Sequence, residues 1–138
     1  MRFAFDHQND RTTLAVSAMR IAREAGLTTR ACWEVATSVA ELVSNATRYA
    51  GGGELEIRLV SEPRRALEVV VRDRGPGLPD ADKAVMDGWS RGRWLAPDEP
   101  RRESLGTGLG AVLRLMSEMK IESTIGVGTT VTARKWIP

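Results

Sequence analysis

The sequence predicts an α+β fold, a two-layer α/β sandwich in which helices cover one face of a mixed β-sheet. Between residues 10 and 50, apolar residues recur at helical spacing. In several later segments they alternate with polar residues, as in strands that bury one face. No internal repeat or linker interrupts these patterns, so we expect a single domain over residues 1–138.

Two helices are expected in the first part of the chain. The first covers residues 10–25, and Gly26 suits its C-terminal cap. The second begins at Thr28 or Thr29, because either side chain can cap a helix N-terminus. It ends near Ala50, where three consecutive glycines follow.

Strands are expected on both sides of these helices. Residues 2–7 alternate and predict a first strand, and the runs 55–59 and 67–72 predict a hairpin. A second hairpin is predicted at the end of the chain, where 120–125 and 130–136 flank a Gly-Val-Gly turn.

The segment between the two hairpins is less regular. A short helix is expected over 80–86, and residues 88–107 have no period, so we interpret them as a mobile loop. A helix over 108–119 then opens directly from glycines. The loop contains Trp94 and four arginines: Arg91, Arg93, Arg101 and Arg102. These arginines could contact a γ-phosphate or an acidic partner, and the alternative is a solvated loop.

The composition excludes several function classes. Hydrophobic residues make up 42% and charged residues 28% of the chain, as in ordinary globular domains. Aromatic residues are only 5% and the net charge is +2, so nothing resembles a nucleic-acid-binding surface. No apolar run could span or target a membrane. With one histidine and one cysteine, Cys32, a Cys/His metal site is ruled out, and a cytoplasmic location is expected.

Glu41 and Asn45 lie four residues apart on the polar stripe of the second helix, so their side chains project from successive turns in the same direction. An amide oxygen of Asn45 can bind Mg²⁺, which prefers few protein ligands. A carboxylate one turn earlier can accept a proton from an attacking hydroxyl group. The alternative is an ordinary solvated helix face.

Two further segments fit a nucleotide. Asp73 ends a strand and can accept a hydrogen bond from an adenine amino group, while Gly75 and Gly77 allow backbone to approach a flat ring. The run Gly106-Thr107-Gly108-Leu109-Gly110 precedes an apolar helix, and bare N–H groups at such a start can bind phosphate. Each segment also occurs as a plain turn.

One motif is set aside. Residues 88–92 fit the nucleophile elbow of α/β hydrolases. No strand leads into them, and the only histidine, His7, precedes the serine instead of following it.

The order of these motifs resembles the GHKL (Bergerat-fold) ATPase superfamily, which includes gyrase, Hsp90, histidine kinases and MutL. Within it the chain is most similar to the anti-sigma-factor serine/threonine kinases, above all the RsbT-type switch kinases. Five segments in order carry the resemblance: Ala40 to Gly51, Asp73 to Asp80, Met86 to Ser90, Leu105 to Met116, and Gly126 to Thr129.

The resemblance implies ATP and Mg²⁺ as cofactors. It implies that Glu41 is the catalytic carboxylate, that Asn45 is the Mg²⁺ ligand, and that Asp73 holds the adenine amino group with Thr129 nearby. Gly75 and Gly77 would shape the base pocket, and the residues at 106–110 would wrap the phosphates: Gly106, Thr107, Gly108, Leu109 and Gly110.

The implied protein substrate is a STAS-domain anti-sigma-factor antagonist, whose phosphorylation switches partners. A sigma factor, a downstream phosphatase and a second copy of the chain are further partners that the sequence leaves open. An anti-sigma factor acting by sequestration and a detached histidine kinase domain are the alternatives. The loop at 88–107, the expected ATP lid, is longer than the resemblance implies.

Overall fold

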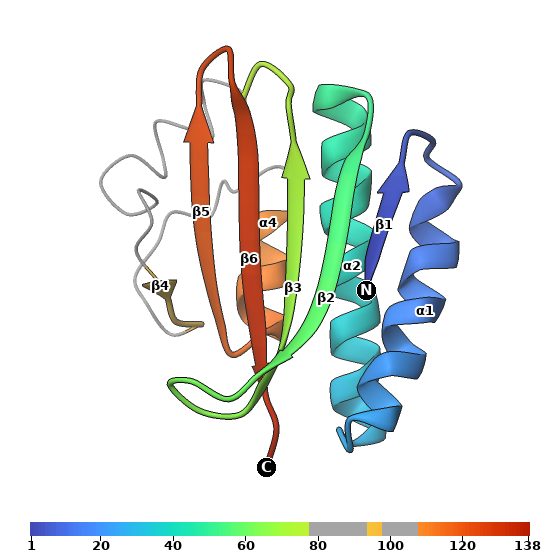
Figure 1. Cartoon of the computed structure of the whole chain (residues 1–138), viewed down its shortest axis with the longest axis vertical. Helices are drawn as coiled ribbons and strands as arrows, with labels where there is room; N and C mark the ends of the chain where they lie inside the picture. The colour runs from blue at the N-terminus through green and yellow to red at the C-terminus, as the bar shows by residue number, and fades with distance from the viewer. Residues whose placement is uncertain (78–93, 98–107) are drawn as a thin grey trace.

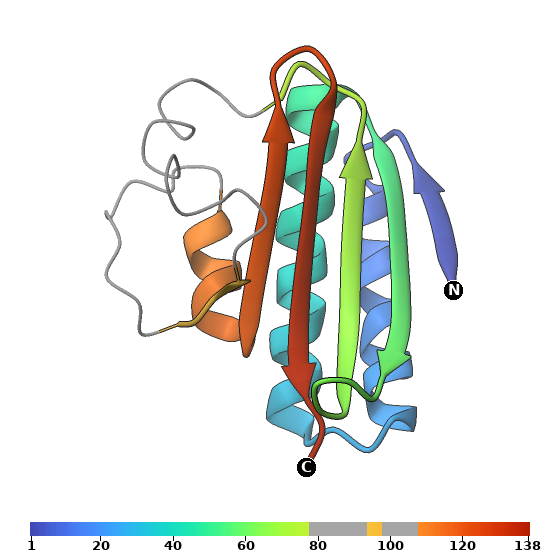
Figure 2. The same ribbon diagram turned by 60° about the vertical axis from the view of Figure 1, so that its left-hand side comes forward.

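A computed structural model describes residues 1–77, 94–97 and 108–138. Its six strands form one sheet in the order β1-β2-β3-β6-β5-β4, and the helices α1, α2 and α4 cover one face of it (Figures 1 and 2). The predicted two-layer α+β architecture is therefore confirmed. The strands are β1 (Arg2–Phe5), β2 (Gly53–Val60), β3 (Ala66–Asp73), β4 (Trp94–Leu95), β5 (Glu118–Thr124) and β6 (Gly128–Trp136).

The sheet differs from the prediction in one respect. We expected a mixed sheet, but all pairs between the described strands are antiparallel. The reason is that β2–β3 and β5–β6 are hairpins, and the two hairpins meet through an antiparallel β3–β6 pair.

The two long helices have the expected bounds. α1 spans Asp10–Glu24 and α2 spans Thr29–Ala50. The hydroxyl oxygen of Thr28 accepts a hydrogen bond from the Ala31 N–H at 3.1 Å, which caps α2. Gly51 ends it with a φ of 75°, a left-handed conformation that favours glycine.

The later part of the chain is less like the prediction. α4 spans only Leu109–Leu115, because Met116 is extended and β5 has begun at Glu118. Pairing with β6 therefore overrides the apolar helical period that continues to Met119. Trp94–Leu95, inside the predicted irregular loop, forms the edge strand β4. The predicted helix over 80–86 lies outside the described residues.

The core lies between the sheet and the helix layer. Leu42 on α2, Leu67 on β3 and Leu113 on α4 are all fully buried there. Cys32 is also buried in this core, where its thiol contacts the Leu27 carbonyl. None of the described helices is long and apolar enough to cross a membrane.

None of the described helices covers the opposite face of the sheet, which carries paired charged side chains. Glu68 on β3 is 1% exposed and accepts hydrogen bonds from Arg58 and Arg134, at 2.6 and 2.8 Å. Arg72 binds Glu56 at 3.0 Å. These pairs satisfy the buried carboxylates across three strands.

Candidate functional site

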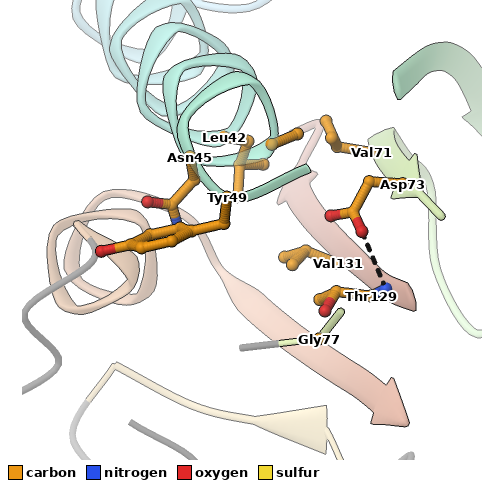
Figure 3. A pocket seen from close by; sticks show the side chains of 9 residues that line it. Leu42, Asn45, Tyr49, Val71, Asp73, Gly77, Thr129 and Val131 are labelled. Atoms are coloured by element: carbon orange, nitrogen blue, oxygen red, sulfur yellow. Dashed lines mark hydrogen bonds between the residues drawn. The ribbon is translucent and has the colours of Figure 1, made fainter. Parts of the chain in front are cut away.

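A pocket lies between the C-terminal half of α2 and the adjoining ends of β3 and β6 (Figure 3). Its position follows from strand pairing. Asp73 is the last residue of β3 and lies opposite Thr129, near the start of β6. Nine of the described residues line the pocket: Leu42, Asn45, Ala46, Tyr49, Val71, Asp73, Gly77, Thr129 and Val131.

Asp73 is fixed at the polar end of this pocket. Its Oδ1 accepts hydrogen bonds from the backbone N–H groups of Gly75 and Thr129, at 3.0 and 3.2 Å. Figure 3 shows the other carboxylate oxygen directed toward the interior of the pocket. An acceptor held in this way can receive an amino group of a ligand.

The walls beside Asp73 are apolar. Leu42, Val71 and Val131 are buried side chains from three different elements, and Tyr49 adds an aromatic ring. The guanidinium group of Arg48 lies 5.2 Å from the centre of that ring. An apolar pocket with one hydrogen-bond acceptor at its end suits a purine base that carries an amino group.

Asn45 lies on the other side of the pocket. It is 7% exposed, and Figure 3 shows its amide directed away from Asp73. Within the described part of the chain, its Oδ1 is buried and has no hydrogen-bond partner. A buried carbonyl oxygen without a partner costs about 1–3 kcal/mol, so an external ligand at this atom would be favourable.

This oxygen fits a magnesium ion. Mg²⁺ prefers hard oxygen ligands and keeps several waters or phosphate oxygens, so one amide oxygen with substrate phosphates is an ordinary donor set. Among the described residues there is no group of three or more His, Cys, Asp or Glu side chains that could hold a metal. Asn45 could supply one oxygen ligand to such an ion, with phosphate oxygens and waters as the others.

Glu41 lies one turn before Asn45 and contacts the start of α4. A Cβ placed on Gly108 would overlap the Glu41 carboxylate, so the carboxylate packs directly on this glycine. Gly108 also has a φ of 83°, a conformation that other residues rarely adopt. The structure thus places Glu41 of α2 directly against Gly108, which precedes α4.

The remaining predicted glycines take different positions. Gly77 lines the pocket with a φ of 93°. Gly75 instead packs against Ala50, the last residue of α2, so it allows the loop after β3 to lie close to this helix. Gly110 is buried in α4 beside Leu109, whose side chain is 1% exposed within the core. Gly106 and Thr107 lie outside the described residues.

Two features at or near the pocket were not predicted. Tyr49 lines the pocket but is not one of the predicted site residues, although its spacing of four residues from Asn45 places it on the same side of α2. Gln8 precedes α1, and its amide bonds the Ser44 carbonyl and hydroxyl at 3.4 and 3.3 Å. No sequence signal indicates this contact, because it joins residues 36 positions apart.

Comparison with known proteins decides the family. A model described as histidine kinase-like ATPase domain matches residues 6–135 of the chain. The chain belongs to this family. The resemblance to GHKL ATPases drawn from the motifs is therefore confirmed.

The chain is also similar to individual proteins with known names. It is 35% identical to serine/threonine-protein kinase RsbT of Bacillus subtilis (strain 168), over 85% of this chain and 81% of the relative. It is 27% identical to an anti-sigma F factor of Geobacillus stearothermophilus, over 98% of this chain and 90% of the relative.

A solved structure supports the fold. The histidine kinase domain from the blue-light activated histidine kinase of Erythrobacter litoralis EL346 matches 93% of this chain with a TM-score of 0.53 and 19% identity. The chain spans 63% of that longer structure. At this identity the match establishes the shared fold alone.

Proposed function

We propose that the chain is a Mg-ATP-dependent protein serine/threonine kinase that phosphorylates a STAS-domain anti-sigma-factor antagonist and works by partner switching in stress or sigma-factor regulation. The observation that supports this most is the arrangement on α2. Glu41 packs on Gly108, and Asn45, one turn later, has a buried oxygen without a partner among the described residues. Two relatives, a serine/threonine kinase and an anti-sigma factor, agree with it.

In this proposal each part of the pocket has one task. The Asp73 carboxylate accepts the adenine amino group, and the apolar walls hold the base. Asn45 holds the cation through its amide oxygen. The bound cation supplies charge neutralisation at the phosphates.

Glu41 acts on the protein substrate. The serine or threonine hydroxyl oxygen forms a bond to the γ-phosphorus, while the bond from this phosphorus to the β–γ bridging oxygen breaks and ADP leaves. The Glu41 carboxylate accepts the hydroxyl proton as general base, a contribution of about 10²- to 10⁴-fold in rate. Gly108 leaves room for that carboxylate because it has no side chain.

Phosphate transfer to a purified STAS-domain partner tests the proposal. With Mg-ATP, the wild type should yield acid-stable phosphoserine or phosphothreonine. Glu41→Gln should lower the transfer rate by about 10²- to 10⁴-fold and leave the dissociation constant for ATP within about threefold. ATP binding without transfer to any such partner would contradict the kinase assignment.

An anti-sigma factor that works mainly by sequestration is the second candidate, favoured by the anti-sigma F factor relatives. Partner affinity separates the two. Under sequestration, Glu41→Ala should bind the partner as tightly as the wild type and should still inhibit transcription by its sigma factor. Under the kinase proposal, Mg-ATP makes the wild type phosphorylate and release its partner, whereas Glu41→Ala cannot phosphorylate the partner and keeps it bound. A downstream phosphatase, a homodimer and a cytoplasmic location are further hypotheses that accompany both candidates.

A further inference from the structure

A pair of hydroxyl groups joins β5 and β6 beside the pocket. Ser123 Oγ and Thr129 Oγ1 are 2.9 Å apart, and either atom can donate the hydrogen bond. The two residues are direct cross-strand partners, so their side chains lie on the same face of the sheet. Thr129 lines the pocket, whereas Ser123 is not one of its described lining residues. Ser123 therefore contacts the wall of the pocket through the Thr129 hydroxyl.

Thr129 is held at two points. Its backbone N–H donates to Asp73 Oδ1 at 3.2 Å, and its hydroxyl bonds Ser123. The residue is 6% exposed. A threonine hydroxyl has one donor and two acceptor sites, so the bond to Ser123 leaves capacity for a ligand. That bond also selects one side-chain rotamer, which fixes the direction of the remaining sites.

We infer that Ser123 is a positioning residue for base recognition. It holds the Thr129 hydroxyl next to Asp73, so that the two groups together bind the edge of a purine that carries the amino group. This inference rests on the proposed nucleotide site. It assigns Ser123 no contact with the nucleotide and no part in phosphate transfer.

The first test compares two nucleotides on the full chain. Ser123→Ala should raise the dissociation constant for ATP about three- to tenfold, as expected for one lost hydrogen bond. Purine riboside triphosphate, which lacks the 6-amino group, should bind within about twofold of its wild-type affinity. Ser123→Thr keeps the hydroxyl and should restore ATP binding. Thr124→Ala, at the exposed neighbouring position on β5, is the matched control and should change neither.

A double-mutant cycle separates positioning from general stability. Thr129→Val removes the hydroxyl but keeps the N–H that Asp73 accepts. In that background Ser123→Ala should have no further effect on ATP affinity. Thr129→Ser provides a second background with a less restricted rotamer, in which Ser123→Ala should cost more than in the wild type.

The outcomes are distinct. Equal weakening of both nucleotides by Ser123→Ala, an undiminished loss in the Thr129→Val background, or no change at all would each overturn the inference while leaving the proposed function intact. Failure of the wild type to bind ATP would instead overturn the nucleotide site and this inference with it. A loss specific to ATP that disappears in the Thr129→Val background supports it.

Discussion

The two ends of the pocket differ in how far the protein completes its own hydrogen bonds. At the Asp73 end, where we propose that the base binds (the base end), Asp73 Oδ1 accepts two backbone N–H groups, and Thr129 is held by Asp73 and Ser123. At the Asn45 end, where we propose that the cation binds (the cation end), Asn45 Oδ1 is buried without a partner in the described structure. The base end is therefore preorganised, whereas the cation end would be stabilised by a ligand at Asn45 Oδ1.

The largest expected effect tests the cation end. Asn45→Leu replaces the amide by an apolar side chain of similar size and should weaken ATP binding in Mg²⁺ at least about 100-fold. Because the unsatisfied oxygen is removed, the free energy of unfolding without ligand should be unchanged or about 1 kcal/mol higher. Calorimetry with and without Mg²⁺, together with urea denaturation, measures both quantities.

The control for this prediction is ATP affinity in EDTA. It should be the same for the wild type and for Asn45→Leu, because the cation is then absent from both. A large loss in EDTA would show that Asn45 acts on the nucleotide itself, and the contrast between the two ends would fail.

The base end should respond differently. Asp73→Asn keeps an oxygen that can accept both backbone N–H groups but places an amide donor where the adenine amino group would donate. ATP affinity should fall about 10- to 100-fold, equally with and without Mg²⁺. The melting temperature should change little. Discrimination between ATP and inosine triphosphate, which carries an acceptor at that position, should also decrease.

A smaller effect is expected where Glu41 contacts the start of α4. The Cβ that Gly108→Ala introduces collides with the Glu41 carboxylate. The alanine must also adopt the left-handed backbone conformation of Gly108, which lowers the free energy of unfolding by about 1–2 kcal/mol. Phosphate transfer should fall about tenfold or more because the carboxylate is displaced.

Gly126→Ala is the matched control. Gly126 has a φ of 76°, but no atom lies near the position of its missing Cβ. The Gly126→Ala variant should lose a similar amount of folding stability as Gly108→Ala and should retain phosphate transfer. Equal losses of activity in the two variants would show that backbone strain, not the contact with Glu41, limits the reaction.

The smallest effect should come from the charged face of the sheet, on the side away from helices α1, α2 and α4. The hydrogen bond from Arg72, opposed by burial and aided by the charges of Arg2 and Arg58, lowers the pKa of Glu56 below its ordinary value of 4.5. The unfolded chain then binds more protons in acid, so this stabilisation is present above pH 4.5 and is lost as the pH falls through the lowered pKa.

Glu56→Gln should therefore melt no more than about 4 °C below the wild type at pH 7, and this difference should vanish in acid. Thermal unfolding from pH 3 to 8 measures it. A difference in melting temperature that grows as the pH falls would contradict the lowered pKa of Glu56. The affinity for ATP at pH 7 should not change.

The sequence predicted local features of the site better than distant ones. The relation of Glu41 to Asn45 follows from helical spacing, and the ends of α2 follow from Thr28 and Gly51. The bond between Asp73 and Thr129 depends on the pairing of β3 with β6, which joins residues 56 positions apart. No local pattern encodes that pairing.

Tertiary pairing also explains the errors. The apolar period that predicted a helix to Met119 is equally compatible with a strand, and pairing with β6 decides in favour of β5. The short edge strand at Trp94 and Leu95 was missed because two residues show no period. Leu95 is nevertheless 1% exposed, buried by the rest of the fold.

The burial of the only cysteine, Cys32, makes this chain convenient for site-specific labelling. Its thiol is 1% exposed, so maleimide reagents will reach it slowly in the folded state. A cysteine introduced at Val127, which is 66% exposed in the β5–β6 turn, would then be the fast-reacting thiol. A fluorophore attached there would test for binding at the proposed nucleotide site from the turn that precedes Thr129, with the native sulfur left in place.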